Sequence, residues 1–345
     1  MVQEKFIQLA HGGGGQLSAE LISDVILPSL GADVSVQKAG SLADAAVLAG
    51  LGKAGSLAFT TDSYVVWPLE FPGGDIGKLS ICGTVNDLSV SGAKPMFLSF
   101  SLVLEEGLEL SLLRRVLASA GKAARQAGVK IVTGDTKVVE RGGLSGMVIN
   151  TAGIGRVHPK SLLGFDKIRQ GDKIIISGPL GEHGLAVMCK RKGLSVRSGL
   201  ESDCAPLNEI THELIAKLGT DIHFMRDPTR GGLAATIVDI TAATGRDIEI
   251  VDELIPLNRS ARAAAHMLGL DLLTIANEGK LVAVVAQKSA DRAVKIMKQF
   301  KIASQSAIIG TVGRKSSDPI VEMVTAAGGR RIVQMPYGEE LPRIC

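Results

Sequence analysis

The sequence has few aromatic residues, few cysteines and no long run of one charge or of apolar residues. Aromatic residues make up 3% of the 345 residues, and the formal net charge is +3, from 38 basic and 35 acidic side chains. Because the two signs are interspersed, nothing indicates binding to nucleic acid or to an anionic membrane. No apolar stretch approaches the length of a membrane span, and residues 1–10 lack the pattern of a signal peptide. We therefore expect a cytoplasmic location, with small molecules or proteins as partners.

The cysteines are scattered and contain no C-x-x-C pair, which excludes a disulfide framework and the usual zinc motifs. They are Cys82, Cys189, Cys204 and Cys345. Cys345 is the last residue, where a thiol has no packing role, and residues 336–341 before it include two carboxylates and few apolar groups. We interpret residues 336–345 as a mobile arm, about 30 Å long when extended, that carries a thiol as a carrier or tether.

Hydrophobic residues make up 46% of the chain and glycine is frequent, at 41 residues, so material for two cores is present and backbone helps to shape the ligand site. Strands and helices alternate along the chain by their apolar periodicity. Strands are predicted at residues 57–66, 96–104, 129–133, 145–157, 172–177, 247–251, 280–285 and 307–312, and helices at 75–92, 109–127, 182–192, 207–218, 229–244 and 290–300. The fold class is α/β (α+β).

Two domains and a tail are predicted from the element order. The boundaries are 1–157 for an N-terminal domain with a mixed sheet, 158–171 for a linker, 172–335 for a C-terminal α/β domain and 336–345 for the tail.

Five aspartates lie beside small residues at or near predicted element ends: Asp44, Asp62, Asp87, Asp135 and Asp227. A single aspartate in such a place is usually a cap or a turn residue. Five of them favour a Mg²⁺ site that also receives nucleotide phosphates. The glycine run that contains Gly13 and Gly14 has two equally good interpretations, a phosphate-binding loop or a linker.

Three further side chains have possible chemical roles. Lys137 is a candidate to neutralise phosphate charge, although a lone lysine is usually a surface residue. Glu278, between Asn277 and Gly279, is a candidate general base, and its alternative is an ordinary turn acid. His183 is either a phosphate donor or simply a residue at the start of a helix.

Taken together, the motifs resemble the HypE family, the carbamoyl dehydratases of nickel–iron hydrogenase maturation, within the aminoimidazole ribonucleotide synthetase superfamily. The motifs are HGGGG, LADAAVL, TTDSYVV, GTVNDLSVSGAKP, TGDTKVV, RDPTRGGL, ANEGKL and the terminal PRIC. All but PRIC mark the superfamily, and PRIC marks the family.

The resemblance implies a homodimer formed by the N-terminal domain and a nucleotide site near the domain junction. It implies that a set of acidic residues binds Mg²⁺–ATP, and that an asparagine side chain and two glycines contact the nucleotide. The implied metal ligands are Asp62, Asp87, Asp135 and Asp227, and the implied nucleotide contacts add Asp44, Asn86, Gly13 and Gly14. It also implies that the carbamoyltransferase HypF loads Cys345 and that a HypC–HypD complex accepts the cyanide.

The expected reaction is ATP-dependent dehydration of a carbamoyl group on Cys345 to a thiocyanate. A thiocarbamate oxygen leaves only after activation, and phosphorylation by ATP supplies that activation. Glu278 is expected to remove the nitrogen protons, with Lys137 beside it stabilising negative charge. Two alternatives stay open here: a small-molecule kinase or ATP-dependent cyclase of the same superfamily, and a nucleotide-sensing scaffold for hydrogenase assembly.

Overall fold

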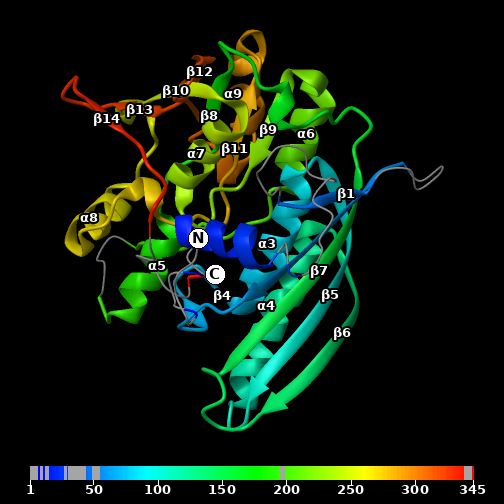
Figure 1. Ribbon diagram of the computed structural model, residues 1–345. Coiled ribbons are helices and arrows are strands. Elements are labelled where there is room, and N and C mark those ends of the chain that lie inside the picture. Colours follow the sequence, from blue (N-terminus) through cyan, green and yellow to red (C-terminus); the bar gives the residue numbers. More distant parts are fainter. Residues whose placement is uncertain are drawn as a thin grey trace.

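The computed structural model describes most of the chain. The described residues are Ile7, His11, 15–26, Ser29, 44–48, 55–194, 199–337 and 344–345. Two sheets dominate the molecule, one built from the first half of the chain and one from the second (Figure 1). Among the described residues, no helix is long and apolar enough to cross a membrane. This arrangement confirms the predicted two-sheet α/β fold.

The first sheet is mixed, as predicted, with strand order β1, β2, β7, β5, β6. Only β5 and β6 pair in parallel; the other neighbours are antiparallel. Its strands are β1 (Ala46–Leu48), β2 (Leu57–Tyr64), β5 (Ala93–Glu105), β6 (Lys130–Val139) and β7 (Met147–Val157). The helices α3 (Ile76–Val90) and α4 (Leu110–Ala127) cover one face of it (Figure 1).

Helix α3 is enclosed on nearly all sides, and this environment explains its apolar and small residues. Asp75 caps its first turn by accepting the N–H groups of Gly77 and Lys78 at 2.8 and 3.0 Å. A Cβ at Gly77 would lie 2.3 Å from the Val116 carbonyl oxygen, and a Cβ at Gly83 equally close to the Tyr64 hydroxyl. The glycines therefore let α3 approach both α4 and the sheet.

The second sheet has the order β14, β13, β10, β12, β8, β11, β9. Its strands are β8 (Lys173–Ile176), β9 (Ile222–Arg226), β10 (Arg246–Val251), β11 (Val282–Val285), β12 (Ala307–Lys315), β13 (Val321–Val324) and β14 (Arg330–Ile332). In β8, Ile174 and Ile176 pack on the α7 side and Ile175 packs on the α6 and α9 side. Both faces of the strand are buried, which explains its continuous apolar run.

The helices of the second half are α5 (Glu182–Arg191), α6 (Asn208–Leu218), α7 (Gly232–Thr244), α8 (Arg259–Leu268) and α9 (Ala290–Met297). Three of them, α6, α7 and α9, pack on the faces of this sheet, whereas α5 and α8 pack against each other beside it. Short 3₁₀ turns connect several elements, namely η5 (Phe165–Lys167), η6 (Gly219–Asp221), η7 (Asp252–Leu254), η8 (Leu272–Thr274), η9 (Gln287–Ser289) and η10 (Lys301–Ala303). Before the first sheet lie α1 (Gln16–Leu21) and a π-helical turn (Ile22–Ile26), and a small hairpin joins β3 (Glu70–Phe71) to β4 (Gly74–Asp75).

The sequence-based element prediction was incomplete in two ways. It missed β1, β3, β4, β9, β13 and β14, which are strands of at most five residues, and also the helix α8. It also ended one strand at residue 133, whereas β6 continues to Val139 because it stays paired with β5 over that length. Asp135 and Lys137 therefore lie inside a strand and not at its end. The domain boundaries at 157, 171 and 335 stay a prediction.

Candidate active site

Helix α3 meets the second half of the chain through the side chain of Asn86. Its Nδ2 donates to the carbonyl oxygens of Ala205 and Glu278, both at 3.1 Å, and its Oδ1 accepts the Leu207 N–H at 2.8 Å. Asn86 is completely buried. Its amide thus joins α3 to two loops of the second half, and both of its N–H donors are used by the protein itself.

Next to this joint, acidic side chains gather, and we call them the acidic cluster: Asp44, Asp62, Asp87, Asp227 and Glu278. Burial raises the pKa of Asp87 well above its usual range, and the charges of Asp227, Asp44 and Asp62 raise it further. Burial and then the charge of Asp44 raise the pKa of Asp227 to about 8. The structure therefore brings together four of the five aspartates selected from the sequence, on segments far apart in the chain.

Glu278 is 2% exposed, and its Oε1 is buried without a hydrogen-bond partner. Burial, followed by the charges of Asp227 and Asp203, raises the pKa of Glu278 well above its usual range. A carboxylate with a raised pKa is a stronger proton acceptor than a solvated one when it is ionised. The site chemistry thus suits the base role predicted for it.

A buried network fixes the turn that carries Glu278. The Asp203 carboxylate accepts the N–H groups of Glu278 and Gly279, both at 3.2 Å. Lys280 Nζ lies 3.1 Å from Asp203 and 3.0 Å from Glu182. A Cβ at Gly279 would lie 1.9 Å from the Asp203 carbonyl oxygen, so only glycine fits there. Sequence reasoning missed Asp203 and Lys280, although Lys280 is in the same ANEGKL motif as Glu278.

Two arginines bring positive charge to the cluster. Arg226 lies 3.3 Å from Asp44 and 2.8 Å from Asp239. Burial raises the pKa of Asp62, and the nearby Arg230 opposes that rise. The Cys345 thiol group is the largest cause of the raised pKa of Arg230. Sequence reasoning selected neither arginine, although both flank Asp227 in the motif RDPTRGG.

The last two residues of the chain lie within this site. The Val65 N–H donates to the Cys345 carbonyl oxygen at 3.2 Å, and Ile344 is 4% exposed within the core of the first half. The C-terminal end accordingly lies between the two sheets, near α5 and β4 (Figure 1). Burial raises the pKa of the Cys345 thiol, the charge of Glu278 raises it further, and Arg230 lowers it. The predicted carrier thiol and the predicted base are thus neighbours in one subunit.

Asp135 and Lys137 lie elsewhere. Both are exposed, and they pair with each other at 2.7 Å. Asp135 on β6 is in register with Ser101 on β5, and Ser101 pairs with Asn150 on β7, so these side chains share one face of the sheet. Asp62 on β2 pairs instead with Thr151, the next residue of β7, which is buried. Because successive strand residues face opposite sides, Asp135 and Lys137 project from the open face of the sheet and Asp62 from the face under α3. Within one subunit, the structure does not bring Lys137 beside Glu278.

The remaining predicted positions, Gly13 and Gly14, lie outside the described residues. His183 lies at the start of α5, as one of its two interpretations held, and it contacts the C-terminal tail.

The acidic cluster fits a divalent cation with nucleotide phosphate. Asp227 is 3% exposed and its Oδ2 is buried with no hydrogen-bond partner, and the mutual repulsion of Asp44, Asp62, Asp87 and Asp227 is reduced by added positive charge. Within the described ranges, no three acidic, histidine or cysteine side chains form a ready-made metal site. The donor set therefore suits Mg²⁺, which binds few carboxylates and completes its shell with water and phosphate oxygens.

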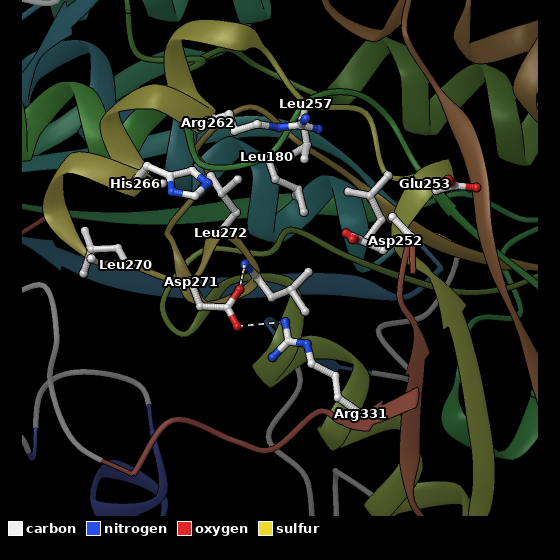
Figure 2. A pocket seen from close by; sticks show the side chains of 15 residues that line it. Leu180, Asp252, Glu253, Leu257, Arg262, His266, Leu270, Asp271, Leu272 and Arg331 are labelled. Atoms are coloured by element: carbon white, nitrogen blue, oxygen red, sulfur yellow. Dashed lines mark hydrogen bonds and ion pairs between the residues drawn. The ribbon is translucent and has the colours of Figure 1, made fainter. Parts of the chain in front are cut away.

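A separate cavity of about 830 Å³ lies between α8, the turns η7 and η8, and β14 (Figure 2). Its lining is mixed, with Leu180 and Leu272 next to charged side chains, and Asp271 pairs with Arg331 at 2.9 Å. None of the site residues predicted from the sequence lines it. The cavity is therefore distinct from the acidic cluster.

This fold is that of the AIR synthase related proteins. Residues 42–157 match the N-terminal domain of that family, and residues 169–321 match its C-terminal domain. The chain is 44% identical to the carbamoyl dehydratase HypE of Rhizobium leguminosarum bv. viciae over 339 residues, covering 98% of this chain and 95% of the relative. The chain therefore belongs to the HypE family within the AIR synthase related proteins.

Solved structures agree with this assignment. A HypE–HypF complex contains a chain with 41% identity and a TM-score of 0.84, covering 92% of this chain and 99% of the other. A HypE structure in complex with ATP has 44% identity and a TM-score of 0.80, covering 97% of this chain and 98% of the other.

Proposed function

We propose that this protein is an ATP-dependent carbamoyl dehydratase that converts an S-carbamoyl group on its own Cys345 to a thiocyanate. The observation that carries the proposal is the position of Cys345, whose thiol lies with Glu278 and Arg230 in the acidic cluster. A terminal thiol that only packs would not be surrounded by ionisable groups. The HypE relatives and the ATP-bound relative support the same activity.

The overall reaction converts the thiocarbamate and ATP into thiocyanate, ADP and phosphate. The γ-phosphoryl group supplies the activation, since it turns the carbamoyl oxygen into part of a phosphate leaving group. The carbamoyl oxygen then leaves in phosphate, and the nitrogen loses both of its protons as the C≡N bond forms. Glu278 takes one nitrogen proton, a role to which its raised pKa suits it, and the departing phosphate takes the other.

The protein's own residues hold the reacting groups. Asp203 fixes the backbone of Glu278, and Lys280 holds Asp203 in place. Arg230 offers positive charge to the oxygen side of the substrate, where negative charge develops. Cys345 is partly buried in the site, which limits the access of bulk water to the intermediate.

Magnesium completes the proposed cofactor set. Asp62, Asp87 and Asp227 would hold Mg²⁺, which neutralises phosphate charge when bound, with Asp44 and Arg226 beside them. We keep Gly13, Gly14 and Asn86 in the proposed nucleotide site, although Asn86 also joins the two halves of the chain.

A homodimer would give Asp135 and Lys137 a place in the reaction. Both project from the open face of the first sheet, which also exposes Phe59, Ile154 and Phe97 in one cross-strand row. Exposed apolar rows of this kind mark protein interfaces. We propose that a second copy covers this face and that Asp135 and Lys137 serve the partner's acidic cluster as metal ligand and phosphate-neutralising cation.

Loading and unloading of the thiol are assigned to partner proteins. The raised pKa of Cys345 makes the docked thiol a poor nucleophile, so loading would occur with the tail away from the cluster. We propose HypF as the carbamoyl donor, since a relative forms a HypE–HypF complex, and a HypC–HypD complex as the cyanide acceptor. A carrier thiol must stay reduced, which favours the cytoplasm.

Mass spectrometry of the C-terminal peptide tests this function. The protein is loaded with HypF, carbamoyl phosphate and ATP, freed of nucleotide and HypF by gel filtration, and then given Mg²⁺ with ATP or a non-hydrolysable analogue. We expect the Cys345 peptide to carry a carbamoyl group and to lose one water only with ATP.

Two variants sharpen this test. Glu278→Gln should bind ATP and accept the carbamoyl group but stall before water is lost, whereas the exposed Glu201→Gln should behave as wild type. An unmodified Cys345 in the presence of demonstrably active HypF would sink the proposal. The kinase, cyclase and scaffold alternatives would then return, although no specific observation favours them now.

A further inference from the structure

His183 contacts the end of the tail inside the protein. It lies in the first turn of α5 and has no exposed surface. Its Nε2 lies 2.8 Å from the Ile344 carbonyl oxygen, and its Nδ1 lies 2.8 Å from the Ser202 hydroxyl. Its ring stands at 85° to the Phe71 ring, with the ring centres 5.3 Å apart.

The hydrogen-bond chemistry defines the protonation of the ring. A carbonyl oxygen only accepts, so His183 Nε2 carries the proton and donates it to Ile344. The other nitrogen, Nδ1, then accepts from the Ser202 hydroxyl, whose oxygen itself accepts the Cys204 N–H at 3.1 Å. Burial lowers the pKa of His183, which favours the same neutral ring.

Ser202 in turn is anchored to the first half of the chain. Its N–H donates to the Pro72 carbonyl oxygen at 2.8 Å, in the turn between β3 and β4. The imidazole therefore has a fixed orientation before the tail arrives, because Ser202 holds its Nδ1 and the Phe71 ring packs against it. Its single free donor points at the place where the Ile344 carbonyl lies.

The tail uses both of its last residues to dock. The Ile344 side chain is buried in the core, its carbonyl accepts from His183, and the Cys345 carbonyl accepts from Val65. Withdrawal of the tail would take away the acceptor of the His183 Nε2–H, which is unfavourable for a donor that has no exposed surface. The ring thus favours the docked tail without touching the reacting sulfur.

We propose that His183 is a positioning residue that latches the docked tail through the Ile344 carbonyl and so holds Cys345 in the acidic cluster for dehydration. The proposal rests on the proposed function for its kinetic consequence, but docking itself is a separate property. It follows that the latch must open whenever another protein loads or unloads the thiol. Weakening the latch should therefore slow dehydration without slowing loading.

The first test measures how accessible the thiol is. Each variant is treated with limiting iodoacetamide, and alkylation of the Cys345 peptide is followed by mass spectrometry. His183→Phe keeps an aromatic ring beside Phe71 but removes the donor, and we expect at least tenfold faster alkylation. His183→Gln offers an amide donor and should restore slow alkylation in part. The exposed His266→Phe is the matched control and should react as wild type.

The second test separates positioning from a general structural role. Protein already carrying the carbamoyl group is mixed with Mg²⁺ and ATP, and thiocyanate formation is followed over a single turnover. His183→Phe should slow this step at least tenfold while its loading rate equals or exceeds that of wild type. A general loss of structure would slow both steps together, and that result would overturn the proposal.

A third measurement tests the latch even if a His183 variant does not fold. Ser202→Ala leaves the imidazole in place but removes its support, and it should accelerate alkylation several-fold. A double-mutant cycle completes the test. It compares the thermal midpoints of His183→Gln, of a chain ending at Arg343 and of the variant with both changes, and the two decreases in midpoint should be less than additive. Unchanged alkylation in folded His183 and Ser202 variants would refute the latch. If wild-type protein forms no thiocyanate at all, the proposed function fails, and the alkylation rates still decide the latch.

Discussion

Replacement of Asn86 by alanine tests whether this side chain mainly holds the two halves of the protein together. The change removes the hydrogen bonds to Ala205, Leu207 and Glu278, and the Glu278 carbonyl keeps only the long contact from the Ala205 N–H at 3.5 Å. With a net value of about 0.5–1.5 kcal/mol for each bond, the three together contribute about 1.5–4.5 kcal/mol. We therefore expect Asn86→Ala to destabilise the fold by about 3 kcal/mol.

The size of this effect sets the assay. At about 2.1 cal/mol/K of unfolding entropy per residue, 3 kcal/mol corresponds to a fall of about 4 °C in the thermal midpoint of the whole chain. Asn208→Ala is the matched control, because Asn208 makes one such bond, from its Nδ2 to the Ala127 carbonyl at 3.0 Å. It should lower the midpoint by about 1–2 °C. Differential scanning calorimetry without nucleotide measures both.

The result also separates two roles of Asn86. If the side chain joins the halves, the loss of stability appears without nucleotide and comes with slower dehydration, because the Glu278 carbonyl has lost its anchor. If Asn86→Ala keeps the wild-type midpoint and only weakens ATP binding, the structural account is refuted and Asn86 is simply a nucleotide ligand.

Three further predictions follow from the site and the sheet. The folded pKa of Asp227, about 8, exceeds its unfolded value near 3.8, so the folded state keeps this proton longer and stability declines as pH rises from about 4 to about 8. In chelator-treated buffer, Asp227→Asn should remove this decline in thermal scans; an equal decline in both proteins would contradict it. Gly279→Ala places a Cβ against the Asp203 carbonyl and should slow dehydration about a hundredfold. Gly121→Ala is the control, because its Cβ has room on α4, and it should not slow dehydration. Equal single-turnover rates for the two variants would count against the fixed turn that carries Glu278. Phe97→Asp puts a charge on the open face of the first sheet and should convert a dimer into a monomer in light scattering; an unchanged mass would remove this face from the dimer interface.

Local sequence was sufficient for most of the regular elements. The apolar run at residues 172–177 predicted β8, the periodic residues at 109–127 predicted α4, and Gly128, at a φ of 68°, ends that helix as expected. The motifs around Asp87, Asp227 and Glu278 also pointed to acidic side chains that the structure brings together. Each of these signals resides in residues close together in the chain, and for this reason the sequence alone was enough.

Other features depended on register and on contacts between distant residues. Whether Asp135 faces the same side as Asp62 depends on strand pairing across β2, β7, β5 and β6, and a shift of one residue would reverse it. No local pattern of charge or polarity marks that register.

The sequence by itself determined most of the longer elements, the family and the chemical groups available, because periodicity, glycine positions and motifs are local properties. Only the tertiary structure decided that Asn86 joins the two halves, that Arg230 lies beside Cys345 and that His183 holds a carbonyl 161 residues further along the chain. Such pairings form when two sheets bury their faces and bring distant polar groups into a site without water, where each donor must find an acceptor.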